Sequence, residues 1–144
     1  MKHSAIVAAA MAALLVAGAA DARDSHLKLP IKDALAANNA SSTLGTDVKF
    51  FFGADAPKAA KTMGTYTSNK KTNFANKSDK EGCEWAFLSA MIALKERAVA
   101  EGGNAVINIQ SYYKKNEFSS ATEYECGAGA FVGGVTLRGT VVKL

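Results

Sequence analysis

The stretch CEWAFLSAMIALKERAVAEGGNAVINIQSYYKKNEFSSATEYEC, residues 83–126, decides the fold of this chain. It begins and ends with the only two cysteines in the sequence. Between them the pattern predicts a long helix, a Gly-Gly stop, a strand, a polar turn and a second strand. The stretch therefore predicts how the core is held together, but it contains no catalytic or ligand-binding motif.

The best-defined predicted element is a helix over residues 79–101. Ser78 and Glu81 stand three residues apart at its start, which is the spacing of a capping box. Apolar residues then recur at helical spacing in a wide stripe, which predicts a well-buried helix: Trp85, Phe87, Leu88, Met91, Ile92, Leu94 and Ala98. Gly102 ends the helix, because glycine adopts the left-handed conformation of a helix end without a Cβ clash.

The remaining sequence favours strands on both sides of this helix. Alternation and β-branched or aromatic content predict strands at 48–52, 60–68, 105–113, 122–126 and 135–144. An extended segment and then a short helix beginning near Pro30 are expected in residues 27–37. Residues 38–46 and 69–77 have loop composition. The predicted fold class is α+β, with one long helix (about 79–101) packed on a mainly antiparallel sheet.

The first 22 residues have the features of a cleaved export signal. Lys2 supplies a positive start, residues 4–20 are almost wholly small and apolar, and Ala20-Asp21-Ala22 is a small-x-small cleavage pattern. The apolar run is short and alanine-rich for a membrane span. No cysteine lies near the cut, so a lipid anchor is not expected. We expect a signal peptide of residues 1–22, a single α+β domain of residues 23–144, and a periplasmic or secreted bacterial protein.

The charge pattern gives little information about partners. The net charge is +4, a value that supports solubility. Lysines gather in residues 58–80, but a nucleic-acid surface would also need arginines and interleaved aromatic residues, and this stretch has no arginine. We expect no nucleic-acid partner and no membrane span, and the oligomeric state stays open.

Cys83 and Cys126 are expected to form a structural disulfide, because two cysteines in an oxidising compartment normally pair. Cys83 lies in the first turn of the predicted helix. Cys126 shares a strand face with Tyr124, whereas Glu123 and Glu125 point the opposite way and are expected to be solvated. A helix packed on the cysteine face would bring the two thiols together.

Two other roles for the cysteines remain open. A helix N-terminus lowers the pKa of a thiol, so Cys83 could be a redox-active thiolate, although catalytic pairs usually stand close in sequence. A metal site would need more ligands than the two cysteines and His26, the only histidine after the predicted signal. We expect no metal and no cofactor.

No motif in the chain supports an enzyme. Residues 127–134 (GAGAFVGG) suggest a phosphate-binding loop, but Val132 stands where the third glycine belongs and a strand is predicted next, not a helix. No G-x-S-x-G sequence is present, and His26 falls in a terminus expected to be flexible. We therefore expect no catalytic residue, and a binding surface either on the polar face of the sheet or in the lysine-rich residues 69–80.

The chain resembles a known superfamily through Gly-Thr-Tyr at 64–66, the two cysteines, Gly-Gly-Asn-Ala-Val at 102–106 and Tyr-Glu-Cys-Gly-Ala-Gly-Ala at 124–130. This superfamily joins the YbjQ-like heavy-metal-binding domains and the Rcs outer-membrane stress-sensor lipoprotein. The resemblance covers about residues 60–142 and implies a small α+β fold of strand, long helix and hairpin, with cysteines ahead of the helix and before a glycine-rich strand. Unlike the stress sensor, this chain has no lipobox cysteine.

A closer resemblance is to short exported proteobacterial proteins that carry the segments CEWAFLSA, GGNAV and TEYECGAGA. They are often labelled excinuclease ATPase subunits, but this chain has no Walker motif. The expected function is a non-enzymatic binding or interaction domain of the cell envelope, with an envelope protein as the candidate partner. The alternatives are a small-molecule or metal binder that acts as an oligomer, and a thiol–disulfide redox protein.

Overall fold

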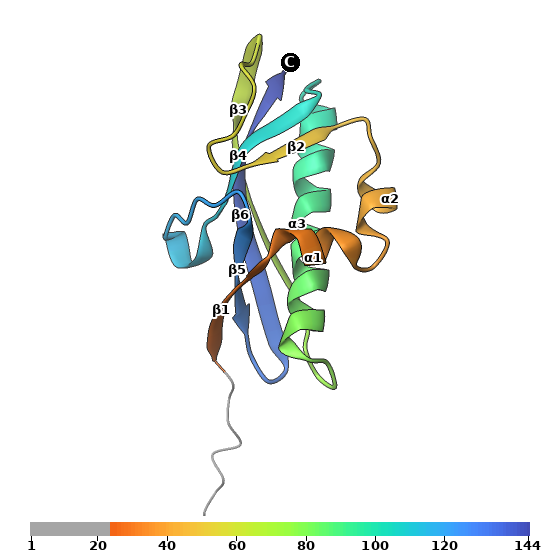
Figure 1. The fold of residues 1–144 in the computed structure, drawn as a ribbon, viewed down its shortest axis with the longest axis vertical. Coiled ribbons are helices and arrows are strands. Elements are labelled where there is room, and N and C mark those ends of the chain that lie inside the picture. Colours follow the sequence, from red (N-terminus) through yellow and green to blue (C-terminus); the bar gives the residue numbers. More distant parts are fainter. Residues whose placement is uncertain (1–23) are drawn as a thin grey trace, which may run out of the picture.

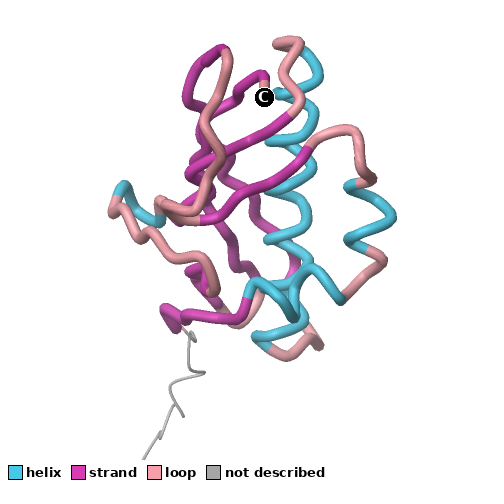
Figure 2. Tube along the Cα trace, turned by 45° about the horizontal axis from the view of Figure 1, so that its top comes forward, coloured by secondary structure: helices cyan, strands magenta, loops and turns pink. Residues whose placement is uncertain are grey.

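The computed structural model describes residues 24–144, and the predicted signal peptide lies outside the described residues. The described chain forms one curled, six-stranded sheet with a long helix packed against it (Figures 1 and 2). The strands are β1 (Ser25–Pro30), β2 (Lys49–Phe52), β3 (Lys61–Asn73), β4 (Ala105–Ser111), β5 (Glu123–Ala128) and β6 (Val132–Lys143). The helices are α1 (Ile31–Ala36), α2 (Ala40–Leu44), α3 (Asp79–Ala100) and the 3₁₀ turn η1 (Tyr113–Lys115).

Strand β6 organises the sheet. It pairs along its length with the edge strand β3 on one side, and with β5 and then β4 on the other, all antiparallel. β1 pairs with β5 antiparallel, and β2 pairs with β4 parallel. The predicted α+β class and mainly antiparallel sheet are therefore confirmed.

Helix α3 forms where the sequence predicts it. The Ser78 hydroxyl accepts a hydrogen bond from the Glu81 backbone N–H at 3.1 Å, as the capping box requires. Gly102 lies just beyond the helix with φ of 74°, the left-handed conformation that favours glycine. One part of the predicted stripe is wrong: Trp85 is 41% exposed, because it lies beyond the edge of the face that packs on the sheet.

Two loop predictions are also wrong. Residues 38–46 contain α2, whose Ala40 and Leu44 are buried in the core. Residues 69–73 continue strand β3, although their composition is that of a loop, because each of them pairs with β6 as far as Asn73 opposite Val132. Cross-strand pairing overrides local composition at this place.

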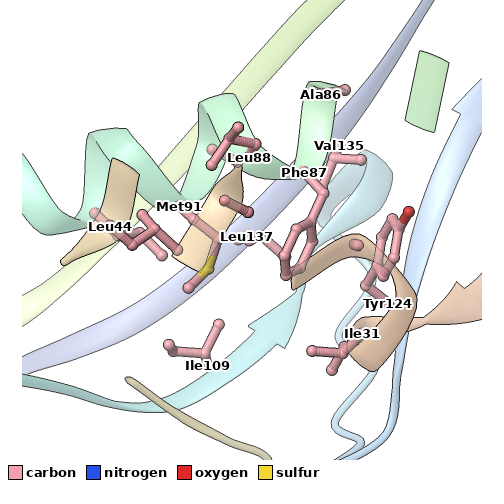
Figure 3. Packing of buried hydrophobic residues seen from close by; sticks show 14 of the residues in the cluster. Ile31, Leu44, Ala86, Phe87, Leu88, Met91, Ile109, Tyr124, Val135 and Leu137 are labelled. Atoms are coloured by element: carbon pink, nitrogen blue, oxygen red, sulfur yellow. The ribbon is translucent and has the colours of Figure 1, made fainter. Parts of the chain in front are cut away.

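The core lies between α3 and the sheet and is closed at its side by α1 and α2 (Figure 3). The Phe87 ring lies 4.5 Å from the Tyr124 ring, centroid to centroid, and Met91 lies over β6 near Leu137. Ile31 of α1 and Leu44 of α2 are less than a tenth exposed. The helix therefore covers one face of the sheet, which we call the inner face.

The N-cap of α3 gives a first testable prediction. Ser78→Ala removes the acceptor of the Glu81 N–H and is expected to lower the free energy of unfolding by about 1 kcal/mol. The measurement is urea unfolding followed by circular dichroism. The control is Ser119→Ala, an exposed serine outside any helix, and an equal loss in both variants would contradict the capping role.

The Tyr124 hydroxyl gives a second prediction. No described residue forms a hydrogen bond with this buried hydroxyl, and burial raises its pKa, with Glu84 and Asp33 raising the pKa further. Because a buried polar atom without a partner destabilises a core, Tyr124→Phe is expected to leave the thermal midpoint unchanged or higher. Tyr66→Phe is the matched control: the Arg97 guanidinium lies 4.0 Å from the centre of its half-buried ring, a contact that phenylalanine keeps, so little change is expected there. A clear loss in Tyr124→Phe would contradict this description of the core.

Candidate binding pocket on the outer face of the sheet

The face of the sheet opposite α3, here called the outer face, carries the candidate site. Along β5 the side chains alternate, so that Tyr124 and Cys126 enter the inner core while Glu125 and Gly127 face outward. The segment 112–122, which contains η1, lies on this outer side of the sheet (Figure 1). It covers part of the face and leaves a hollow beside it.

Glu125 is the buried charge of the outer face. Its carboxylate contacts His26 Nε2, and its backbone N–H donates to the Ser111 hydroxyl at 2.8 Å. The residue is only 5% exposed, so the expectation of a solvated glutamate is wrong for Glu125 and right for Glu123. The contacts of Glu125 with His26 of β1 and Ser111 of β4 explain the difference.

His26 lies in strand β1, not in a flexible terminus as expected. It sits opposite Gly127 in the β1–β5 register. Its ring lies 4.7 Å from the Tyr113 ring, centroid to centroid. The His26–Glu125 pair lies beside the hollow, and the Tyr113 ring, tilted against His26, lines it.

The hollow is a pocket of about 330 Å³. Its floor is formed by glycines of β5 and β6, with Gly127 paired to Gly134 across the two strands. Its walls come from β3, from the turn around Tyr113 and from Asp24, the residue just before β1. A volume of this size lies at the lower end of the range for small-molecule sites in proteins.

The glycines of the floor are required by close contacts. A Cβ at Gly127 would lie 2.5 Å from the Tyr113 hydroxyl, and one at Gly134 would lie 2.7 Å from the Lys70 carbonyl oxygen. The sequence predicts a bend, a bulge or close contact with the helix in this glycine-rich segment. At Gly127 and Gly134 the close contacts are instead with Tyr113 and with Lys70 of β3.

The polar groups around the pocket include two lysines. Lys71 of β3 and Lys114 of η1 both line it, and the Lys114 ammonium lies 5.4 Å from the centre of the Tyr113 ring. Asn69 and Thr136, paired across β3 and β6, supply neutral hydrogen-bonding groups. The carboxylate of Asp24 is the one acidic side chain among the lining residues described. Two cations and one anion give the lining a positive balance.

The sequence singled out two regions that meet in this pocket. Asn69 and Lys71 come from the lysine-rich residues 69–80, and Thr136 comes from the polar face of the sheet. Tyr113 and Lys114 were not predicted as site residues. Their participation depends on how segment 112–122 folds back over β5, and no local pattern in the sequence signals that.

The two cysteines lie on the other side of the sheet, in the inner core. Their sulfur atoms are at disulfide distance, with Cα atoms 5.9 Å apart, and both residues are completely buried. The prediction that the helix and the strand bring Cys83 and Cys126 together is confirmed. Within residues 24–144 no group of three or more histidine, cysteine, aspartate or glutamate side chains is arranged to hold a metal ion.

No helix in residues 24–144 has both the length and the apolar character that crossing a membrane requires. Comparison of the chain with models of protein families, with curated proteins and with solved structures gives no match. The site must therefore be interpreted from its own geometry.

Proposed function

We propose that this chain is a non-enzymatic binding domain of the bacterial cell envelope, exported to the periplasm by its N-terminal signal. The observation that carries the proposal is the outer-face pocket, a concave space with a glycine floor and walls of mixed polar and aromatic side chains. Sites for small ligands are typically concave, few in number and furnished with a small set of polar groups. The same geometry favours a small ligand over a large protein partner.

The contacts around the pocket support binding more than catalysis. His26 and Glu125 contact each other beside the pocket, and among the described residues no serine, threonine or cysteine side chain is hydrogen-bonded to the His26 ring as an activated nucleophile would be. The Ser111 hydroxyl is buried and accepts the Glu125 backbone N–H. We assign the pair to holding the pocket wall in place.

The burial of the cysteines supports a structural bridge in place of redox exchange. A thiol that exchanges electrons with partners must be reached by them, whereas Cys83 and Cys126 have no exposed surface. A disulfide there also suits an oxidising compartment such as the periplasm. The resemblance to YbjQ-like domains and the Rcs stress sensor is part of the proposal and extends to the fold alone.

The experiment that tests the proposed function is native mass spectrometry of the mature protein, isolated gently from periplasm. A non-covalent small-molecule adduct is expected on the wild type. The adduct should be absent from Lys71→Glu/Lys114→Glu, which reverses both lysines at the pocket. Lys61→Glu/Lys115→Glu is the matched control, since it changes the net charge equally at exposed lysines of the same strand and turn that do not line the pocket.

Two outcomes would contradict the proposed function. One is a wild-type protein with no adduct in repeated preparations. The other is an adduct that survives the pocket variant but disappears from the control, which would place binding elsewhere on the surface.

A further inference from the structure

We propose that the outer-face pocket takes an acidic ligand of about the size of a sugar ring, with one carboxylate or phosphate group held between Lys71 and Lys114. The inference rests on the proposed function, because it names the chemical class of ligand for the same pocket. Its argument comes from the charges, the floor and the size of the pocket.

The charge of the lining selects for an anion. Lys71 and Lys114 reach the pocket from β3 and η1, which belong to different parts of the chain. No salt bridge joins either lysine to an acidic side chain among the described residues. Their ammonium groups are therefore free to bind a carboxylate or phosphate oxygen by charge-assisted hydrogen bonds.

The glycine floor of the pocket makes room for an aromatic ring. Gly127 has no side chain, and the Tyr113 ring packs in the space that a Cβ at this position would occupy. The Tyr113 ring lies tilted against the His26 ring, with centroids 4.7 Å apart. An aromatic ring at the floor provides apolar contact for one face of a ligand ring and leaves the edges of the ligand free for hydrogen bonds.

The remaining polar groups of the lining can form hydrogen bonds with hydroxyl groups of a ligand. Asn69 and Thr136 can each donate and accept, and the Asp24 carboxylate can only accept. A ligand hydroxyl would donate to Asp24, whereas a second ligand anion would be repelled by it. The pocket is therefore expected to hold a polyhydroxylated ring with a single acidic group, and its volume of about 330 Å³ leaves room for one such ring.

Nuclear magnetic resonance titration of the mature, oxidised protein tests the inference. The probes are glucuronate, which carries a carboxylate, glucose 6-phosphate, which carries a phosphate, and neutral glucose. The readout is the amide signals of the pocket glycines, Gly127, Gly129, Gly133 and Gly134. At least one acidic probe should shift these signals saturably, with an affinity at least tenfold above that of glucose.

The two double variants test whether the acidic probe binds at Lys71 and Lys114. Lys71→Glu/Lys114→Glu is expected to weaken binding of the acidic probe at least tenfold, and Lys61→Glu/Lys115→Glu less than twofold. A response to glucuronate alone assigns a carboxylate ligand, and a response to glucose 6-phosphate alone assigns a phosphate ligand. Both responses support the inference, since either group satisfies the two lysines.

Three results would overturn the inference: no saturable shift at the glycines with any probe, equal affinity for glucose and the acidic probes, or equal weakening in both double variants. These failures are distinguishable from failure of the proposed function. An adduct that is seen by mass spectrometry and lost in the pocket variant would keep the function while excluding an acidic sugar ring as the ligand.

Discussion

Removal of the Cys83–Cys126 bridge is expected to lower the free energy of unfolding by up to about 4 kcal/mol. The bridge spans 43 residues of sequence. In the chain-entropy account, closing a loop of that length lowers the entropy of the unfolded chain and so destabilises the unfolded state by roughly this amount. Typical domains are stable by only about 5–15 kcal/mol. The loss would therefore consume a large share of the stability of the fold.

The variant for this test is Cys83→Ala/Cys126→Ala, compared with oxidised wild type by urea unfolding. The control is a reducing agent, which should lower the midpoint of the wild type and leave that of the double variant unchanged. Oxidised wild type is also expected to show no alkylatable thiol after unfolding. Two alkylatable thiols, or a wild-type midpoint insensitive to reduction, would contradict a structural disulfide.

Phe74→Ala is expected to lower the free energy of unfolding by about 3–5 kcal/mol, the usual cost of deleting a fully buried phenylalanine ring. Phe74 is completely buried. Its ring lies against two glycines, Gly82 of α3 and Gly133 of β6, where an added Cβ would come within 2.7 Å of it. The ring therefore joins the start of the helix to the β5–β6 turn.

Phe131→Ala is the control for Phe74→Ala. Phe131 is 74% exposed, although its backbone carbonyl accepts the Phe74 N–H at 2.8 Å. This variant deletes the same kind of ring from the segment that is hydrogen-bonded to Phe74. It should change the free energy of unfolding by less than about 0.5 kcal/mol. Thermal and urea unfolding measure both variants, and similar losses in the two would contradict the packing described for Phe74.

The parts of the fold that were predicted correctly carry local signals. Helix α3 has its capping serine, its apolar stripe and its terminal glycine within one continuous stretch, so each signal reinforces the others. The facing of Cys126 toward the helix follows from strand alternation alone. These features require no knowledge of which strand pairs with which.

The parts that were missed depend on contacts between distant segments. Residues 69–73 become strand only because β6 pairs with them. The face of Glu125 follows from strand alternation, but its burial depends on β1 supplying His26 and on β4 supplying Ser111. The pocket also depends on distant segments, since its walls come from Asp24, β3 and η1 while its floor comes from β5 and β6.

The central claim is that α3 and the disulfide occupy the inner face of the sheet and leave the outer face for binding. Hydrogen–deuterium exchange of the oxidised mature protein, with and without a small-molecule extract of periplasm, tests it most directly. Added extract is predicted to slow exchange in peptides covering residues 111–115 and 123–136, and to leave α1, α2 and α3 unchanged. Protection confined to the helices, or no protection anywhere, would contradict the claim.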